Sequence, residues 1–356
     1  MSLLTNLLYR APSPSRRALR LHRTAPVADL HVDTLLAHTL TGYDATKRHK
    51  PWIPFSPLLN QVDLPRARDA GVKILGMGLV SSPKHAPKKR LAQVDKQLDY
   101  VDELAGNSDN GFYRIGDFAS LTTGLNEQKI GALPGVEGAH VLGGDMGVFR
   151  HLVSRGIRYF GLSHFSTNEA AYCAFGLNAS ETEGLTDFGR KLVERCEQEH
   201  LILDLAHINK PGFLDVCAML STPPIVSHTG VTGVCDHWRK RNIDDEQIEA
   251  VAKLGGVVGI MFSPDFCGNS NFATLEVIAD SIEHVAKGVG YRHVAIGSDM
   301  DGWLLTLPRG LADVSDLPNL TEILIRRGWT DEQLTALLGG NVLRVLHTVL
   351  PEGKPS

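Results

Sequence analysis

Five side chains of metal-binding type each follow a short apolar run in this sequence of 356 residues: His31, Asp33, Glu137, His207 and His228. Imidazole nitrogens and carboxylate oxygens are ligands that zinc accepts in proteins. The apolar runs before them are typical of buried strands. Because parallel strands of a barrel end at one shared mouth, ligands that are far apart in sequence can converge there on one metal cluster.

His31 and Asp33 form a His-x-Asp pair at the end of the first apolar run. Alternate residues of an extended segment share one face, so both side chains can reach one cation. Such a pair on its own is more often an ordinary surface pair. The position at a strand end favours metal binding.

Glu137, His207 and His228 complete the predicted cluster. Glu137 precedes Gly138, and its two carboxylate oxygens can hold two cations about 3.5 to 4 Å apart, as in two-metal hydrolases. The alternative for Glu137 is a capping acid of the next helix. The predicted cofactor is a pair of Zn2+ ions bridged by Glu137, although manganese or cobalt would accept similar ligands.

Asp299 ends the last apolar run, in Gly297-Ser298-Asp299. With the metal positions filled by other residues, Asp299 is free to take a proton from a bridging water and pass it to a leaving amine. Asp301 is the alternative, or it shapes the turn before Gly302. His164, at the end of another run, is expected to bind substrate, and the roles of third-site ligand and structural hydrogen bonder stay open.

Arg239 and Arg241 follow His228 closely enough to lie on the same loop. A guanidinium group there can bind a substrate carboxylate through two parallel hydrogen bonds. The alternative is that both arginines are solvated.

The elements that must position these residues are eight strands separated by helical stretches. This alternation predicts a (β/α)8 barrel. Two helices have clear start signals: 184–200, with Thr186 as N-cap, and 244–254, with acids in its first turn. The strands are expected at 27–33, 72–80, 130–137, 157–163, 201–206, 224–228, 256–262 and 293–299.

The domain organisation expected is a single catalytic barrel over 27–349, with an insertion at 81–129. A basic arm over 1–26 precedes it, and a tail over 350–356 follows. The basic run from Lys84 to Arg90 is expected to be a solvated face, because charge clusters on exposed helices need no partner.

Composition excludes several classes of function. The chain has 43% hydrophobic and 21% charged residues and a net charge of -4, so we expect a globular protein that does not bind nucleic acid. About 18 uninterrupted apolar residues occur nowhere, so no membrane span is expected. The Arg-rich start lacks the apolar core of a secretory signal, although it could be a transit peptide. Five cysteines without paired spacing, Cys235 near the mouth among them, indicate reduced thiols and a cytoplasmic location.

Beyond these single features, the chain resembles the renal (membrane) dipeptidase family of zinc peptidases. The resemblance is carried by Gly135-Val136-Glu137-Gly138, by Leu203-Asp204-Leu205-Ala206-His207, and by the segments 29–33, 61–66, 162–164, 184–190, 226–228, 297–302 and 341–345, in this order.

This resemblance implies that His31 and Asp33 hold one zinc, that His207 and His228 hold the other, and that Glu137 bridges them. It also implies His164 as a contact to substrate or intermediate, Asp299 as the proton-handling acid and Arg241 as the carboxylate clamp. The substrates would be dipeptides, often with a D-residue at the carboxyl end.

The chain departs from the family pattern in two loops. Phe165 to Ala170 differs from the usual segment, with Asn168 as a candidate substrate contact and Glu169 as an extra acid. The stretch from Cys235 to Asn242 is about two residues longer than usual, so Arg239 and Arg241 compete for the clamp role.

The function expected is therefore hydrolysis of a small peptide substrate, most simply a dipeptide, by a hydroxide shared between two zinc ions. One alternative is another metal-dependent hydrolase acting on a lactone, a phosphoester or an N-acyl amino acid, because fold does not fix substrate. A second is a non-catalytic binding protein. A homodimer is an open alternative for the oligomeric state.

Overall fold

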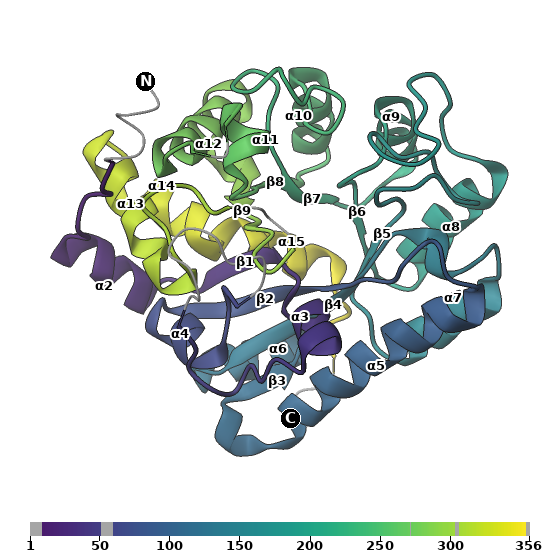
Figure 1. Cartoon of the computed structure of the whole chain (residues 1–356), viewed down its shortest axis with the longest axis horizontal. Helices are drawn as coiled ribbons and strands as arrows, with labels where there is room; N and C mark the ends of the chain where they lie inside the picture. Colours follow the sequence, from purple (N-terminus) through teal and green to yellow (C-terminus); the bar gives the residue numbers. More distant parts are fainter. Residues whose placement is uncertain (1–8, 51–59, 271, 303–305, 354–356) are drawn as a thin grey trace.

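Eight parallel strands close into a barrel surrounded by helices in the computed structural model, which describes residues 9–50, 60–270, 272–302 and 306–353 (Figure 1). β1 pairs with both β2 and β9, and β2 pairs with β4, so the ring is complete. The predicted (β/α)8 fold is confirmed. Its strands are β1 (Val27–Val32), β2 (Val72–Leu79), β4 (Ile130–Glu137), β5 (Tyr159–Gly161), β6 (Ile202–Asp204), β7 (Ile225–Thr229), β8 (Val257–Ile260) and β9 (Val294–Ile296).

A further short strand, β3 (Phe112–Arg114), was not among the predicted strands. It pairs with residues 130–132 at the start of β4, whereas β5 pairs with residues 135–137 at its end. β5 has three residues, so β3 supplies hydrogen-bond partners along the rest of that strand edge. β5, β6 and β9 are equally short but lie within longer apolar runs, whereas Arg114 interrupts the apolar residues at β3, so no run marked it in the sequence.

The helices alternate with the strands around the barrel. α8 (Asp187–Gln198) begins at Thr186, whose side chain accepts a hydrogen bond from the Gly189 amide, as predicted. α10 (Asp245–Lys253) begins with a capping box between Asp244 and Gln247. The predicted insertion holds α5 (Pro87–Gly106), β3 and α6 (Phe118–Asn126). The others are α2 (Arg16–Thr24), α3 (Thr34–Thr41), α4 (Leu64–Asp69), α7 (Met146–Ser154), α9 (Lys210–Met219), α11 (Pro264–Gly268), α12 (Leu275–Val289), α13 (Leu317–Arg326), α14 (Asp331–Thr335) and α15 (Asn341–Val349).

The two ends of the chain lie outside the ring of strands. In the expected N-terminal arm, α2 packs on α13 through the buried ring of His22, which hydrogen-bonds Thr321. Arg17 and Arg20 both pair with Asp331. Residues 1–8 of this arm and 354–356 of the expected tail lie outside the described part. No helix among the described residues is both long and apolar enough to span a membrane.

One end of the barrel is closed by α15. Its apolar residues, Val342, Val345, Leu346 and Val349, pack with inward-facing strand residues such as Leu30. The Asn341 amide donates to the carbonyls of Tyr291 and Val294, where β9 begins. α15 therefore covers the amino ends of the strands and leaves their carboxyl ends open.

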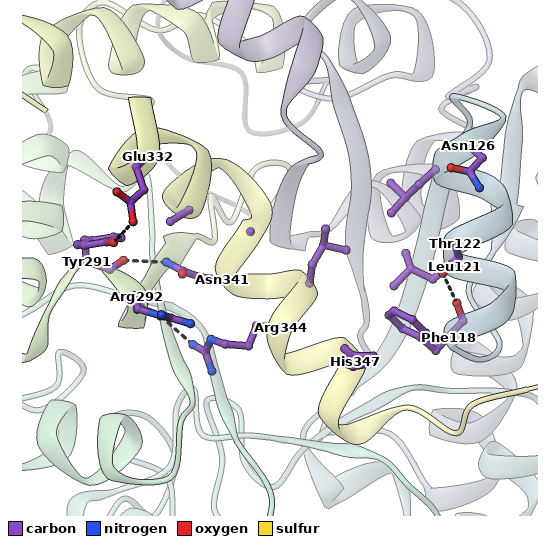
Figure 2. Close-up of a pocket in the computed structure, with 14 residues that line it drawn as sticks. Phe118, Leu121, Thr122, Asn126, Tyr291, Arg292, Glu332, Asn341, Arg344 and His347 are labelled. Carbon is purple, nitrogen blue, oxygen red and sulfur yellow. Dashed lines mark hydrogen bonds between the residues drawn. The ribbon is translucent and has the colours of Figure 1, made fainter. Parts of the chain in front are cut away.

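A cavity of about 560 Å³ lies at this closed end, between α6 and α15 (Figure 2). Its walls combine apolar side chains, such as Phe118, with Arg292, Arg344 and His347. Among the described residues, the groups that could hold a metal lie elsewhere. Residues at the amino end of a barrel usually contribute to stability rather than to catalysis, so the functional site must be sought at the other end.

Candidate metal centre

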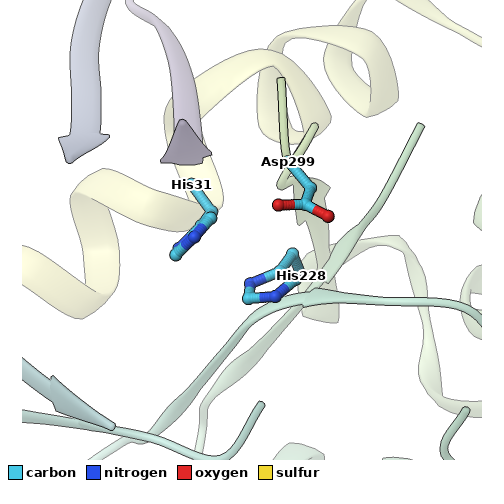
Figure 3. Close-up of side chains that lie close together, drawn as sticks. All are labelled: His31, His228 and Asp299. Carbon is cyan, nitrogen blue, oxygen red and sulfur yellow. The ribbon is translucent and has the colours of Figure 1, made fainter. Parts of the chain in front are cut away.

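The acid and imidazole side chains singled out in the sequence lie at the carboxyl ends of the strands. His31 and His228 are the last residues but one of β1 and β7, and Glu137 is the final residue of β4. His207 and Asp299 follow β6 and β9 by three residues. Figure 3 shows His31, His228 and Asp299 close together. All five side chains are buried.

The Glu137 carboxylate lies at the centre of this cluster. Its Oε1 atom is 3.0 Å from Nε2 of His207, 3.5 Å from Nε2 of His228 and of His164, and 3.7 Å from Nε2 of His31. His207 and His228 face each other with their Nε2 atoms 2.8 Å apart. Four imidazoles from four strand ends therefore surround one carboxylate oxygen.

Three groups of potential metal ligands result, each with its ligand atoms within 4.8 Å of one another: His31, Asp33 and Glu137; Glu137, His207 and His228; and His31, His228 and Asp299. Glu137 belongs to the first two groups. The five ligands expected from the sequence thus lie together, with Asp299 beside them.

Unpartnered buried atoms show that this cluster suits a cation. His31 Nε2, Asp33 Oδ1 and Glu137 Oε2 are buried without a hydrogen-bond partner in the described part of the chain. Buried charged groups are normally paired or coordinate metals, because isolated burial is costly. Gly78 leaves the room that is needed: a Cβ atom there would collide with Asp33 Oδ1 and lie 3.0 Å from His31 Nε2.

The protonation preferences agree with metal binding. Burial, reinforced by nearby Arg241, lowers the pKa values of His207 and His228 well below the usual value, so both rings are neutral and can donate a lone pair. Burial raises the pKa of Glu137. For His31, burial lowers the pKa, but the Glu137 and Asp33 carboxylates outweigh it and raise the pKa to about 10. The cluster therefore has an excess of negative charge that a proton or a metal ion would neutralise.

A hydrogen-bonded relay behind His228 fixes the tautomer of its ring. The Ser227 hydroxyl is 2.6 Å from Oδ2 of Asp204 and 2.9 Å from Nδ1 of His228. A hydroxyl has one proton, and Ser227 donates it to the carboxylate, so its oxygen accepts the Nδ1 proton of His228. The lone pair of His228 Nε2 then faces Glu137. Such partners orient metal ligands and raise their basicity.

Two residues of the site hold strained backbone conformations. His207 has a φ of 65° and Asp299 a φ of 60°, in the left-handed region that residues other than glycine rarely adopt. Residues with such strained conformations cluster at functional sites, where contacts with the surrounding structure hold the conformation in place. The turns after β6 and β9 thereby bring both side chains into the mouth.

Asp301 has a different role from Asp299. Its buried carboxylate accepts hydrogen bonds from the Thr34 hydroxyl at 2.9 Å and from the backbone N–H of Gln61 at 2.7 Å. Both interactions fix the loop after β9. Asp299, in contrast, lines the open cavity at the metal cluster, which favours it over Asp301 for proton transfer.

The cavity above the cluster has a volume of about 270 Å³. His164 and Arg241 line it together with the cluster residues. Arg241 is 3% exposed; its Nη2 donates to the His228 carbonyl at 3.1 Å, and its Nε has no hydrogen-bond partner among the described residues. Arg239 is exposed and lines a neighbouring hollow instead. The geometry thus favours Arg241 for the clamp.

Asn168 is not among the residues that line this cavity. Its side-chain amide donates to the Leu162 carbonyl at 2.9 Å, and its Oδ1 atom accepts from the Ala170 amide at 2.8 Å. These bonds shape the loop after β5. They also occupy the side-chain nitrogen and oxygen through which Asn168 would bind a substrate. The structure therefore does not bring Asn168 to the site.

Three residues near the cluster were missed by sequence reasoning: Tyr159, Asp204 and Ser227. The Tyr159 hydroxyl is 3.5 Å from His31 Nδ1, and the other two form the relay. Asp204 and Ser227 lie in the same short motifs as His207 and His228. The sequence does mark both residues, because each is a polar group inside an otherwise apolar strand. A buried polar group of this kind needs a hydrogen-bond partner nearby.

The model of the membrane dipeptidase family, peptidase family M19, matches residues 15–352. The chain belongs to this family. It is therefore a hydrolase of a metallopeptidase family, in agreement with the ligand cluster.

Solved structures share its fold. The probable dipeptidase PvdM from Pseudomonas aeruginosa is 21% identical, with a TM-score of 0.83 over 94% of this chain and 98% of that one. A metallopeptidase from Rhodobacter sphaeroides, solved with a phosphinate mimic of L-Ala-D-Ala, is 22% identical, with a TM-score of 0.80 over 92% and 99%. Dipeptidase AC, of the same peptidase family, is 24% identical, with a TM-score of 0.81 over 92% and 99%.

Ser227→Ala should weaken metal binding by about 10- to 100-fold, the usual effect of removing a partner behind a metal ligand. The reason is that His228 loses the acceptor that fixes its tautomer. The measurement is competition between the protein and a chelator for zinc. Ser227→Thr, which keeps the hydroxyl, should retain affinity, as should Ser281→Ala, a buried serine on α12. Wild-type affinity in Ser227→Ala would show that the relay has no role in metal binding.

Proposed function

We propose that this protein is a dipeptidase that hydrolyses the amide bond of small dipeptides with two Zn2+ ions bridged by Glu137. The observation that carries the proposal is the convergence of four imidazoles on Glu137 Oε1 at the open end of the barrel. His31 and Asp33 would hold one ion, and His207 and His228 the other. When bound, the two cations would lower the pKa of an attacking water and polarise the scissile carbonyl.

Asp299 is the proton-transferring residue in this proposal. It lies in one ligand group with His31 and His228 and lines the cavity. In the metal-free protein, burial raises its pKa to about 8, although the nearby positive charges of His31 and Arg241 oppose this shift. A carboxylate with a raised pKa accepts a proton from water and returns it to the departing amine.

Arg241 and His164 position the substrate. The buried guanidinium of Arg241 keeps its charge and has a free Nε–H to donate, so it suits the carboxylate at the end of a dipeptide. Burial lowers the pKa of His164 well below the usual value. Its neutral ring can donate a hydrogen bond to the substrate carbonyl without adding positive charge near the metals.

A dipeptide with a D-residue at its carboxyl end is included in the proposed substrate class. The dipeptide mimic bound to the Rhodobacter sphaeroides metallopeptidase has this chirality. The cavity of about 270 Å³ suits a substrate of this size rather than a long peptide.

Replacing Asp299 by Asn should lower kcat for dipeptides by about 10²- to 10⁴-fold, the range for loss of a general acid or base, and should leave two metal ions bound. Steady-state kinetics and elemental analysis on the same samples separate the two effects. Asp236→Asn, at an exposed position, serves as control. Retained turnover would reject the role of Asp299.

A panel of L,L and L,D dipeptides, lactones and aryl phosphates tests the reaction class. Hydrolysis of lactones or phosphates alone would reject the proposed dipeptidase activity.

Replacing Arg241 by Met should raise KM for a dipeptide by about 10- to 150-fold, as expected for the loss of charged hydrogen bonds. The same substitution at Arg239 should change KM little, because that side chain is exposed outside the cavity. A dipeptide amide, which has no terminal carboxylate, should be nearly insensitive to either change. A larger effect at Arg239 than at Arg241 would contradict the assignment.

A further inference from the structure

Four aromatic side chains form a continuous wall beside the metal centre: Phe165, Phe175, Trp238 and Phe266. Ring centroids are 6.2 Å apart for Phe165 and Phe175, 5.4 Å for Phe175 and Trp238, and 4.9 Å for Trp238 and Phe266. The first two pairs are edge-to-face and the third is tilted, arrangements that aromatic pairs favour. The loops after β5 and β7 and helix α11, which follows β8, supply these rings, so the wall depends on tertiary structure.

Both ends of the aromatic wall contact the polar site. The Phe165 ring lies 4.7 Å from the ring of His164 and 4.8 Å from that of His207. At the other end, the Arg241 guanidinium carbon is 5.9 Å from the centre of the Phe266 ring. Phe165, Trp238 and Phe266 line the same cavity as Glu137 and Asp299. A substrate bound at the metals therefore touches this wall.

The wall exposes apolar surface that a ligand could cover. Phe165 and Phe175 are each 40% exposed, and Leu177 on the same loop is 59% exposed. Removing apolar surface from water is favourable in proportion to its area. A clustered apolar patch beside a polar site commonly marks a binding surface.

We infer that the site selects dipeptides whose carboxyl-terminal residue has a large apolar side chain, aromatic ones above all. This inference rests on the proposed function, in which Arg241 binds the terminal carboxylate. The side chain of that residue starts one bond from the carboxylate, next to Phe266, and Trp238 and Phe175 continue the apolar surface outward from there.

One carboxylate of the cavity wall, that of Asp265, disfavours an acidic side chain at this position. Asp265 lines the cavity directly before Phe266. None of the ion pairs among the described residues neutralises its carboxylate. A glutamate or aspartate at the carboxyl end of the substrate would meet this negative charge, whereas an apolar side chain meets the aromatic rings.

The test compares kcat/KM of the zinc-loaded enzyme for Ala-Phe, Ala-Ala, Ala-Lys and Ala-Asp, each with an L- or a D-residue at the carboxyl end. Ala-Phe should exceed Ala-Ala by about 10- to 100-fold, the gain expected from burying one large apolar side chain. Ala-Asp should be the poorest substrate. Equal values for Ala-Phe and Ala-Ala, or the highest value for Ala-Lys, would overturn the inference. Hydrolysis of none of the dipeptides would instead reject the proposed function itself.

Substitutions in the aromatic wall test whether it causes the preference for a large apolar side chain. Phe175→Ala and Trp238→Ala should each reduce the ratio of kcat/KM for Ala-Phe to that for Ala-Ala by several-fold, and the Ala-Ala rate reports that the enzyme is folded. Phe272 is the matched control, because it is also 40% exposed but lies outside the wall, over Arg309. An unchanged ratio in both wall variants, or an equal fall in Phe272→Ala, would contradict the assignment.

Discussion

The site depends on one buried carboxylate, that of Glu137, surrounded by the Nε2 atoms of four histidines. A buried anion is tolerated only with cations or strong hydrogen bonds close by. Neutral His207 and His228 offer lone pairs rather than protons, so they do not neutralise Glu137 themselves. In the metal-free protein a proton on His31 partly offsets this charge, and a metal ion at the cluster would take over that role.

The barrel provides this arrangement by placing strand ends side by side. Residues more than a hundred positions apart, such as His31 and Glu137, meet because parallel strands end at one mouth. Local features then refine the positions. Gly78 leaves space beside Asp33, the Asp204–Ser227 relay orients His228, and left-handed turns at His207 and Asp299 direct those side chains inward. α15 closes the opposite end and contributes apolar packing instead of chemistry.

The periodic part of this architecture could be predicted from the sequence. Apolar runs of strand length gave the eight barrel strands, and the acid or imidazole at the end of a run gave the residues that cluster at the mouth. β3 could not be predicted, because no apolar run surrounds it, unlike the equally short β5, β6 and β9. Spacing does not reveal which of Arg239 and Arg241 is buried. It also does not reveal that the Asn168 side chain bonds the backbone of Leu162 and Ala170 in its own loop. The aromatic wall joins two loops and α11, so only the folded chain shows it.

Anomalous scattering from crystals of the zinc-loaded protein tests most directly whether Glu137 joins two metal ions. Two peaks about 3.5 to 4 Å apart are expected, the separation usual in two-metal hydrolases. One should lie beside His31 and Asp33, the other beside His207 and His228, with one Glu137 oxygen on each. A single peak, or two peaks of which neither contacts Glu137, would contradict this role of Glu137.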